Sequence, residues 1–318
     1  MKKRVITGIL MALILAPLVF VDILLPILEL FAVVFVVIAS IEMINMYEKA
    51  HHTPIGVKLI VIFSTLVLYL SLVSSSPFCV DSQLVKLLEK INFKIDLILT
   101  LGIIFVLNLS CLVFISDFDA ADIGRCFLAI IYVALGFGAF MTLRFMGIRF
   151  VIYLIIVVMG TDIFALVFGL SFGKHKMAPL ISPKKSWEGA IGGSASALAL
   201  GLVFILLYQN ISNIVPGVEV KDFFEGILDI EAFHPVVFII FIVLLTLSMS
   251  ISGQIGDLVA SKLKRSFNIK DYSNIFPGHG GVLDRFDSLI YSSVIFLFFL
   301  TMAYNILPYI EVLPGLGA

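Results

Sequence analysis

The sequence predicts an all-α protein, a polytopic integral membrane helical bundle of about nine transmembrane helices. Of the 318 residues, 61% are hydrophobic and only 14% are charged, whereas soluble domains carry about 25% charged residues. The mean hydropathy of +1.15 excludes a disordered chain, because so much apolar surface is not left in water. Apolar stretches long enough to cross a bilayer also recur along the chain.

Each predicted helix is a window of about 20 apolar residues, the length that crosses the hydrocarbon core. The windows lie at 5–21, 23–41, 55–73, 97–115, 126–143, 150–168, 190–208, 235–253 and 289–307. The first two are joined so tightly, around Asp22 and Pro26, that we expect a hairpin. The basic start resembles a secretory signal, but no small-residue cleavage site follows; we expect an uncleaved first span, with a cleaved signal as the alternative.

The distribution of Lys and Arg predicts the orientation, because cytoplasmic loops carry the excess of positive charge. Of the 21 basic residues, 15 fall at the N-terminus and in alternate loops that would share its side of the membrane. We therefore expect a cytoplasmic N-terminus in a multi-pass protein of the inner (cytoplasmic) membrane, with its active site facing the cytoplasm. The net charge of −1 provides no bulk attraction for nucleic acid, so we expect no nucleic-acid partner.

We expect one integral membrane domain over 1–318, with N-terminal spans in 1–150 and a catalytic region in 151–318 that carries two polar stretches. The first stretch begins at Asp162, within the sixth span. An ionised carboxylate there costs at least about 2.5–3.5 kcal/mol unless it meets a polar cavity or partner. We expect Asp162 to face the bundle interior; a protonated Asp162, hydrogen-bonded to a neighbouring helix, is the alternative.

The same stretch displays a pair of lysines before a helix. Ser182-Pro183 predicts a turn and an extended Ser182, which leaves Lys184 and Lys185 exposed just before a helix that starts around Trp187. A basic pair near a helix N-terminus suits a phosphate. The alternative is that these lysines only set the topology of the loop.

The second stretch, at 253–287, is more specific. Four polar side chains share one face of a helix that continues the eighth span: Gln254, Asp257, Ser261 and Lys264. Asp284 and Asp287 share a face at the start of the ninth span, after a glycine-rich turn at 278–281. Carboxylates from two helices with cations nearby provide the hard oxygen ligands and the positive charge that a magnesium-bridged phosphate requires. A solvated loop of mixed charge is the alternative.

Residues 261–287 resemble, without a gap, the complete signature of the phosphatidate cytidylyltransferases, the CDP-diacylglycerol synthases. The residues that carry this resemblance are Ser261, Leu263, Lys264, Arg265, Lys270, Asp271, Ser273, Phe276, Pro277, His279, Gly280, Gly281, Val282, Asp284, Arg285, Phe286 and Asp287. The stretch at 173–189 resembles the second recognisable block of the family. The chain departs from the family pattern at Ser186, often Thr, and at Leu170, where members carry a basic residue.

The resemblance implies an all-helical fold with a funnel-like cytoplasmic site, and the transfer of CMP from CTP to phosphatidate, which gives CDP-diacylglycerol and pyrophosphate. The expected catalytic residues are Asp257, Asp284, His279, Asp287, Lys264 and Arg265. The expected substrate-binding residues are Ser182, Lys184, Lys185, Ser261, Lys270, Asp271 and Arg285. His279 is expected either to protonate or orient the leaving pyrophosphate or to fix its loop.

The expected metal is Mg²⁺ or Mn²⁺ on Asp257 and Asp284, with a monovalent cation as a further candidate. The expected partners are CTP, phosphatidate, the lipid bilayer and a second copy of the chain in a homodimer. Two other functions remain open. One is CTP-dependent phosphorylation of a polyprenol or other membrane alcohol, and the other is ion-coupled transport through Asp162 and a broken helix at Ser252-Gly253.

Overall fold

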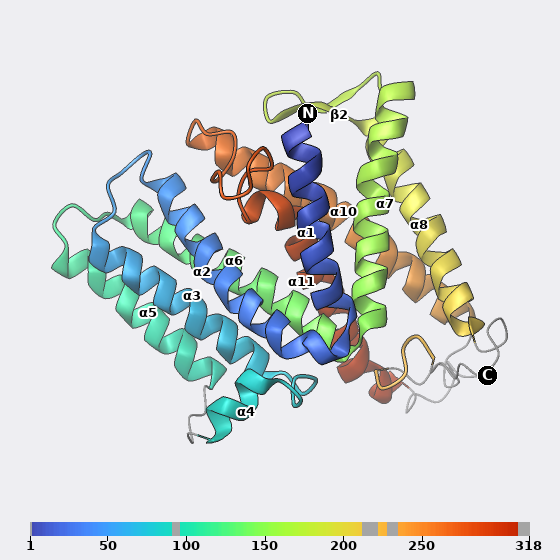
Figure 1. Ribbon diagram of the computed structural model, residues 1–318, viewed down its shortest axis with the longest axis horizontal. Coiled ribbons are helices and arrows are strands. Elements are labelled where there is room, and N and C mark those ends of the chain that lie inside the picture. The colour runs from blue at the N-terminus through green and yellow to red at the C-terminus, as the bar shows by residue number, and fades with distance from the viewer. Residues whose placement is uncertain (1, 91–95, 212–221, 228–234, 311–318) are drawn as a thin grey trace. The chain divides into compact units, whose positions relative to one another are not determined.

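The computed structural model describes residues 2–90, 96–211, 222–227 and 235–310 of the chain (Figure 1). The chain forms two compact units. Unit 1 contains residues 1–148 and 259–290, and unit 2 contains residues 149–258 and 291–318. Because two long helices contribute to both units, each unit is assembled from segments that are far apart in the sequence.

Every predicted span corresponds to a helix. These helices are α1 (Lys2–Phe20), α2 (Leu25–Tyr47), α3 (Ile55–Ser75), α5 (Leu97–Phe114), α6 (Ala120–Met146), α7 (Ile148–Phe172), α8 (Trp187–Gln209), α10 (Pro235–Ser266) and α11 (Leu283–Ile310). In the described part of the chain, eight helices are long and apolar enough to cross a membrane, whereas the apolar part of α1, Thr7–Phe20, is shorter. The predicted fold class is confirmed; the orientation of the termini stays a prediction.

The predicted hairpin between the first two spans is present in unit 1. A short 3₁₀ turn, η1 (Asp22–Leu24), joins α1 to α2. Arg144 of α6 holds this turn: its guanidinium donates to the Asp22 carboxylate at 2.6 Å and to the Val19 carbonyl at 2.7 Å. The arginine is 3% exposed, so its hydrogen bonds fix the hairpin against α6.

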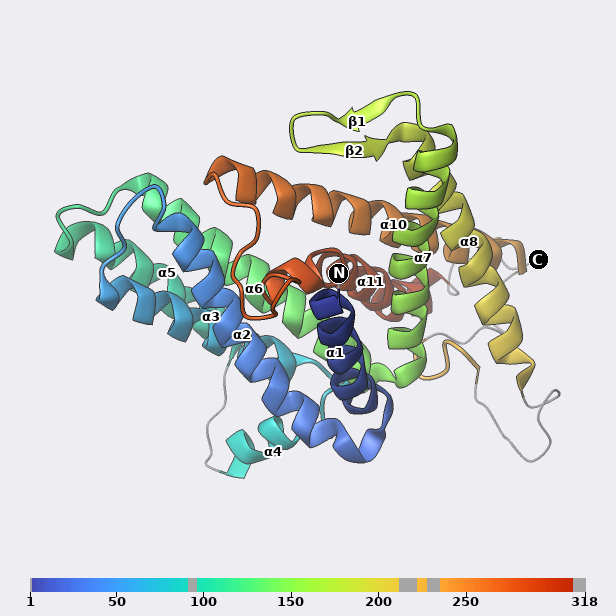
Figure 2. The ribbon, with the colours of Figure 1, turned by 45° about the horizontal axis from the view of Figure 1, so that its top comes forward.

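The remaining helices of unit 1 pack side by side around an apolar core. Figures 1 and 2 show α2, α3, α5 and α6 as neighbours, and the fully buried side chains include Met43, Tyr69 and Ile130. Ser40 and Thr65 turn their hydroxyls back onto carbonyls of their own helices at 2.7 Å. These two hydroxyls therefore need no water.

A short helix in unit 1 was not predicted. This helix, α4 (Gln83–Lys90), has only eight residues and mixes apolar with charged side chains, so no window of span length contains it. Its first turn is held by Glu29 of α2, which accepts hydrogen bonds from the backbone amides of Gln83 (3.0 Å) and Leu84 (2.9 Å). The position of α4 thus depends on a contact distant in sequence.

In unit 2, α7 and α8 approach closely through glycines. A Cβ atom on Gly193 would lie 2.7 Å from the Thr161 carbonyl oxygen, and one on Gly192 would lie 2.5 Å from the Phe168 ring. Near the other end of α7, aromatic rings of Phe150 and Tyr153 pack on Phe296 of α11. Small residues at one end and large rings at the other fix the packing of α7 within this unit.

Between α7 and α8 the chain forms a small antiparallel hairpin, β1 (Lys176–Ala178) and β2 (Ser182–Ser186), visible in Figure 2. The predicted extended conformation of Ser182 is confirmed, since Ser182 begins β2; the predicted turn is displaced, because it lies just before, at 179–181. Pro183 is tolerated because it lies in a two-stranded sheet in which both strands are edges. The predicted helix start is confirmed, since α8 begins at Trp187 with Ser186 as its N-cap.

Candidate functional site

The signature loop, residues 267–282 between α10 and α11, is held by Asp284 in unit 1. Lys264 Nζ donates to Asp284 Oδ1 at 2.6 Å, and the side chains are 11% and 2% exposed. Asp284 Oδ2 accepts from the backbone amides of Tyr272 (2.7 Å) and Gly281 (2.9 Å). Two residues of the predicted site are thereby brought together, and Asp284 fixes both ends of the loop.

A second carboxylate on this loop, Glu42 of α2, was not predicted. It is 1% exposed and accepts from the Ser273 hydroxyl at 2.6 Å and from the backbone amides of Val282 and Leu283 at 2.9 Å each. The available sequence signal is an acidic residue at the end of an apolar span. The cost of a carboxylate in such a span, which singles out Asp162, applies to Glu42 as well.

The glycine-rich turn places His279 inside unit 1. Gly278 and Gly280 have positive φ angles of 79° and 90°, a backbone region that favours glycine. The His279 ring packs against α1, 3.3 Å from the position of a Cβ on Gly8. Its Nδ1 atom is buried and has no hydrogen-bond partner in the described part of the chain.

The other predicted residues of unit 1 differ in exposure. Arg265, Lys270, Asp271 and Arg285 are exposed, whereas Ser261 and Asp287 are half-buried. The Arg265 guanidinium donates to the Ile269 carbonyl at 3.0 Å, and Asp287 accepts from the Ser288 amide at 2.7 Å. Three of the cations that we expect to meet phosphates, Arg265, Lys270 and Arg285, are therefore accessible, while Asp284, which organises the backbone, is covered.

In unit 2, three predicted polar residues form a cluster: Asp162 of α7, Lys185 of β2 and Asp257 of α10. Lys185 Nζ pairs with Asp257 Oδ2 at 2.6 Å, with side chains 24% and 34% exposed. Asp162 interacts electrostatically with both. Asp162 stays accessible, but it lies within electrostatic range of Lys185 and Asp257 from two other elements. A charged partner, which an ionised carboxylate in an apolar span requires, is therefore present.

A buried chain of hydroxyls lies next to this cluster. Thr161 bonds to Ser250 at 2.7 Å, Ser250 to Ser194 at 2.9 Å, and the Gln254 side-chain amide donates to Ser194 at 3.0 Å. These bonds join α7, α8 and α10 within unit 2. They fix the turn of α10 that presents Asp257, three residues after Gln254.

The hairpin carries the remaining predicted lysine. Lys184 is exposed and Ser182 is half-buried. Glu188 ties the hairpin to the start of α8, since its carboxylate accepts from the Lys174 amide at 3.1 Å and interacts with His175 Nδ1 at 2.6 Å. Lys184 therefore lies on a fixed strand with an accessible ammonium group, which suits the binding of a phosphate.

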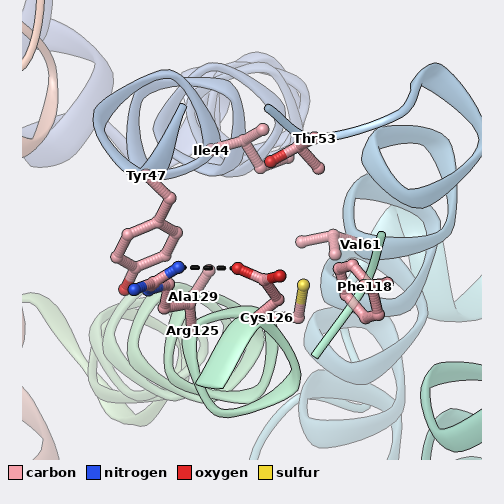
Figure 3. Close-up of a pocket in the computed structure, with 9 residues that line it drawn as sticks. Ile44, Tyr47, Thr53, Val61, Phe118, Arg125, Cys126 and Ala129 are labelled. Atoms are coloured by element: carbon pink, nitrogen blue, oxygen red, sulfur yellow. Dashed lines mark hydrogen bonds and ion pairs between the residues drawn. The ribbon is translucent and has the colours of Figure 1, made fainter. Parts of the chain in front are cut away.

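A small pocket in unit 1 lies outside the predicted site. Its lining includes Tyr47, Arg125 and Cys126 (Figure 3). The Arg125 guanidinium pairs with Asp122 at 2.6 Å, so its charge is already neutralised. No residue predicted to bind metal or substrate lines this pocket.

Among the described residues, no group of three or more His, Cys, Asp or Glu side chains has the geometry of a metal centre. The donor chemistry still fits a hard cation. Asp284 accepts three hydrogen bonds, while a carboxylate offers about four acceptor positions. Within unit 2, Asp257 and Asp162 are accessible carboxylates. Oxygen ligands of this kind are those that Mg²⁺ selects.

Comparisons with known proteins agree with the signature. The Cytidylyltransferase family matches residues 2–303. A phosphatidate cytidylyltransferase of Bacillus subtilis (strain 168) is 31% identical over 308 residues, which cover 96% of this chain and 99% of that protein. One from Staphylococcus haemolyticus (strain JCSC1435) is 36% identical over 176 residues, and one from Staphylococcus aureus (strain COL) is 36% identical over 178; each match covers 55% of this chain and 58% of the relative.

The apolar helices and these relatives define the class of the protein: it is a multi-pass membrane nucleotidyltransferase. The chain belongs to the Cytidylyltransferase family. The resemblance carried by residues 261–287 is thereby confirmed. In the staphylococcal matches the chain spans just under three fifths of the relative's length.

Proposed function

We propose that this chain transfers CMP from CTP to phosphatidate and releases pyrophosphate. The observation that carries the proposal is the match along 96% of the chain to a relative named phosphatidate cytidylyltransferase. The signature residues support it, because Arg265, Lys270 and Arg285 offer accessible positive charge. Such an arrangement suits a triphosphate and a lipid phosphate better than a neutral substrate.

The chemistry requires no protein nucleophile, since phosphatidate is already an anion. One of its phosphate oxygens attacks the α-phosphorus of CTP and forms a new P–O bond. The bond from the α-phosphorus to the bridging oxygen breaks, and its electron pair leaves on pyrophosphate. The protein contributes position and charge neutralisation.

In this proposal the basic residues hold the phosphates. Lys184, Arg265, Lys270 and Arg285 are exposed and face no desolvation barrier to a phosphate oxygen. Lys185 and Lys264 are already paired with aspartates, so they also orient those carboxylates. His279 is proposed to orient or protonate the leaving pyrophosphate, because Nδ1 makes no loop-fixing hydrogen bond in the described residues.

Asp257 and Asp284 are the proposed magnesium ligands, and Asp287 supports Asp284 from the same helix. The ion would neutralise charge on the phosphate oxygens. Because CTP is a cytosolic nucleotide, we propose that the site opens to the cytoplasm. A monovalent cation and a second copy of the chain remain candidate partners, as predicted from the sequence.

The test is an assay of the purified full-length protein in detergent with Mg²⁺, CTP labelled in the cytosine ring, and phosphatidate. We expect a labelled CDP-lipid and one pyrophosphate for each lipid product. Free CDP with a phosphorylated lipid alcohol, when a polyprenol replaces phosphatidate, would establish a lipid kinase instead. Absence of both products with intact protein would overturn the proposed function.

A further inference from the structure

Two buried glutamates of α2 hold the first turns of two different helices. Glu29 is 2% exposed and Glu42 is 1% exposed. Glu29 accepts from the Ser82 hydroxyl (2.9 Å) and from two amides at the start of α4. Glu42 likewise accepts one serine hydroxyl and two amides, at the start of α11. The two carboxylates are therefore matched in burial, helix and hydrogen-bond chemistry.

We propose that Glu42 is a positioning residue of the transfer reaction, which sets the conformation of the signature loop and thereby the place of Asp284 and His279. The inference rests on the proposed function. Glu29 lacks this role, since α4 carries none of the predicted site residues.

The backbone couples Glu42 to Asp284 directly. Three successive amides at the start of α11 are divided between the two carboxylates: Gly281 donates to Asp284, and Val282 and Leu283 donate to Glu42. Free amides at a helix N-terminus carry partial positive charge, which stabilises both anions. Loss of Glu42 therefore releases the peptide groups next to those that Asp284 holds.

The two glycines before α11 make room for these carboxylates. A Cβ on Gly280 would lie 2.6 Å from Asp284 Oδ2, and a Cβ on Gly281 would overlap Glu42 Oε1. Gly280 also has a φ of 90°. The glycine pair is thus explained by two buried acids that approach the backbone, one of which lies outside the signature.

Burial also makes Glu42 sensitive to a change of one atom. Replacement by Gln keeps the size of the side chain but converts an acceptor oxygen into an amino group that only donates. One of the amides of Val282 and Leu283 would then face a donor and lose its partner, which a buried amide does not tolerate without movement. The conformation of the turn is expected to change while the helices remain in place.

The experiment compares Glu42→Gln with Glu29→Gln in purified protein, through the thermal midpoint, kcat and the KM for CTP. We expect similar losses of thermal midpoint, because the contacts are matched. Only Glu42→Gln should lower kcat, by roughly 100-fold, the effect of a small misplacement of reacting groups. The KM for CTP should change by less than about three-fold, since exposed cations still bind the nucleotide. Equal kcat losses in both variants, or a normal kcat in Glu42→Gln, would overturn the inference.

A second variant tests the inference if Glu42→Gln does not fold. Gly281→Ala keeps the glutamate but displaces its carboxylate, and it should lower kcat in the same way; a normal kcat contradicts the proposal.

Amide hydrogen exchange separates this inference from the proposed function. If the wild type makes no CDP-lipid, the proposed function fails, and the loop is judged by exchange alone. Faster exchange at 280–284 only in the Glu42 variant supports its role in holding the loop, and unchanged exchange there refutes it.

Discussion

At the scale of single residues, Asp257 and Asp284 share a chemical type and differ in burial. Each pairs with a lysine at 2.6 Å, but the Asp257 side chain is 34% exposed and that of Asp284 is 2% exposed. The Asp257 pair is half-buried, and water that reaches an ion pair screens it and lowers its contribution to stability. Removal of one partner of a buried pair leaves an uncompensated charge. The sequence alone assigned both aspartates the same role, that of metal ligands.

We therefore expect different effects of two matched substitutions. Asp257→Asn should abolish turnover and change the free energy of unfolding by no more than about 1 kcal/mol. Asp284→Asn should abolish turnover and also cost about 3–5 kcal/mol of stability, because Lys264 is left buried and unpaired. Thermal denaturation in detergent and the CDP-lipid assay measure both quantities.

The control for this pair is Asp81→Asn, which removes an exposed partner of Lys86 and should alter neither quantity. A fully active Asp257→Asn variant would refute the proposed role of Asp257. An Asp284→Asn variant as stable as the wild type would show that the buried pair is not structural.

At the scale of secondary structure elements, the packing of α7 on α8 decides where the hairpin and Lys185 lie. Gly193 allows α8 to approach the backbone of α7 at Thr161. A Cβ added at Gly102 of α5 would meet no atom of the described residues within 4 Å. Both glycines lie within helices, so replacement by Ala changes helix propensity in the same direction at both. A difference in stability between the two variants therefore reports packing.

Gly193→Ala should lower the free energy of unfolding by about 1–3 kcal/mol, since an added methyl group overfills a packed contact. Activity should fall with it, because α8 shifts the strand that carries Lys185. Gly102→Ala should be neutral or stabilise by up to about 1 kcal/mol. Denaturation and kcat measured in parallel test this, and equal stability of the two variants would argue against close packing at Gly193.

At the scale of the whole molecule, the distribution of charge predicts the topology across the membrane. The loops that hold Lys184 and Lys270 belong to the side rich in Lys and Arg, while the loop that holds Asp81 belongs to the other. A cysteine introduced at each position reports its side. The natural cysteines are buried, and burial raises the pKa of Cys79 to about 11, which keeps its thiol protonated and unreactive near neutral pH.

With a membrane-impermeant thiol reagent on intact spheroplasts, we expect labelling of Asp81→Cys and none of Lys184→Cys or Lys270→Cys. Permeabilised membranes should label all three. The wild-type chain, treated with the reagent under both conditions, measures the background from the natural cysteines. Labelling of Lys184→Cys from outside would reverse the topology and separate the site from cytosolic CTP.

Sequence reasoning alone predicts the class of the protein and the positions of its long helices, both of which are confirmed, and it proposes the residues of the candidate site. These features are local: bilayer thickness sets the length of an apolar window, and helical periodicity places Gln254, Asp257, Ser261 and Lys264 on one face. The signature supplied the remaining site residues, because they are contiguous in the chain. The short elements were not predicted, since α4 and the strands of the hairpin are shorter than any window of span length.

Only the tertiary structure decided which charges are paired and which acids hold the backbone. Glu42 meets Leu283 across 241 positions of sequence, and Arg144 meets Asp22 across 122; no periodicity extends over such separations. The difference between an accessible Asp257 and a covered Asp284 arises in the same way, from neighbours that folding brings in. Burial and partner choice are properties of packed helices, so they follow from the fold and not from the residues alone.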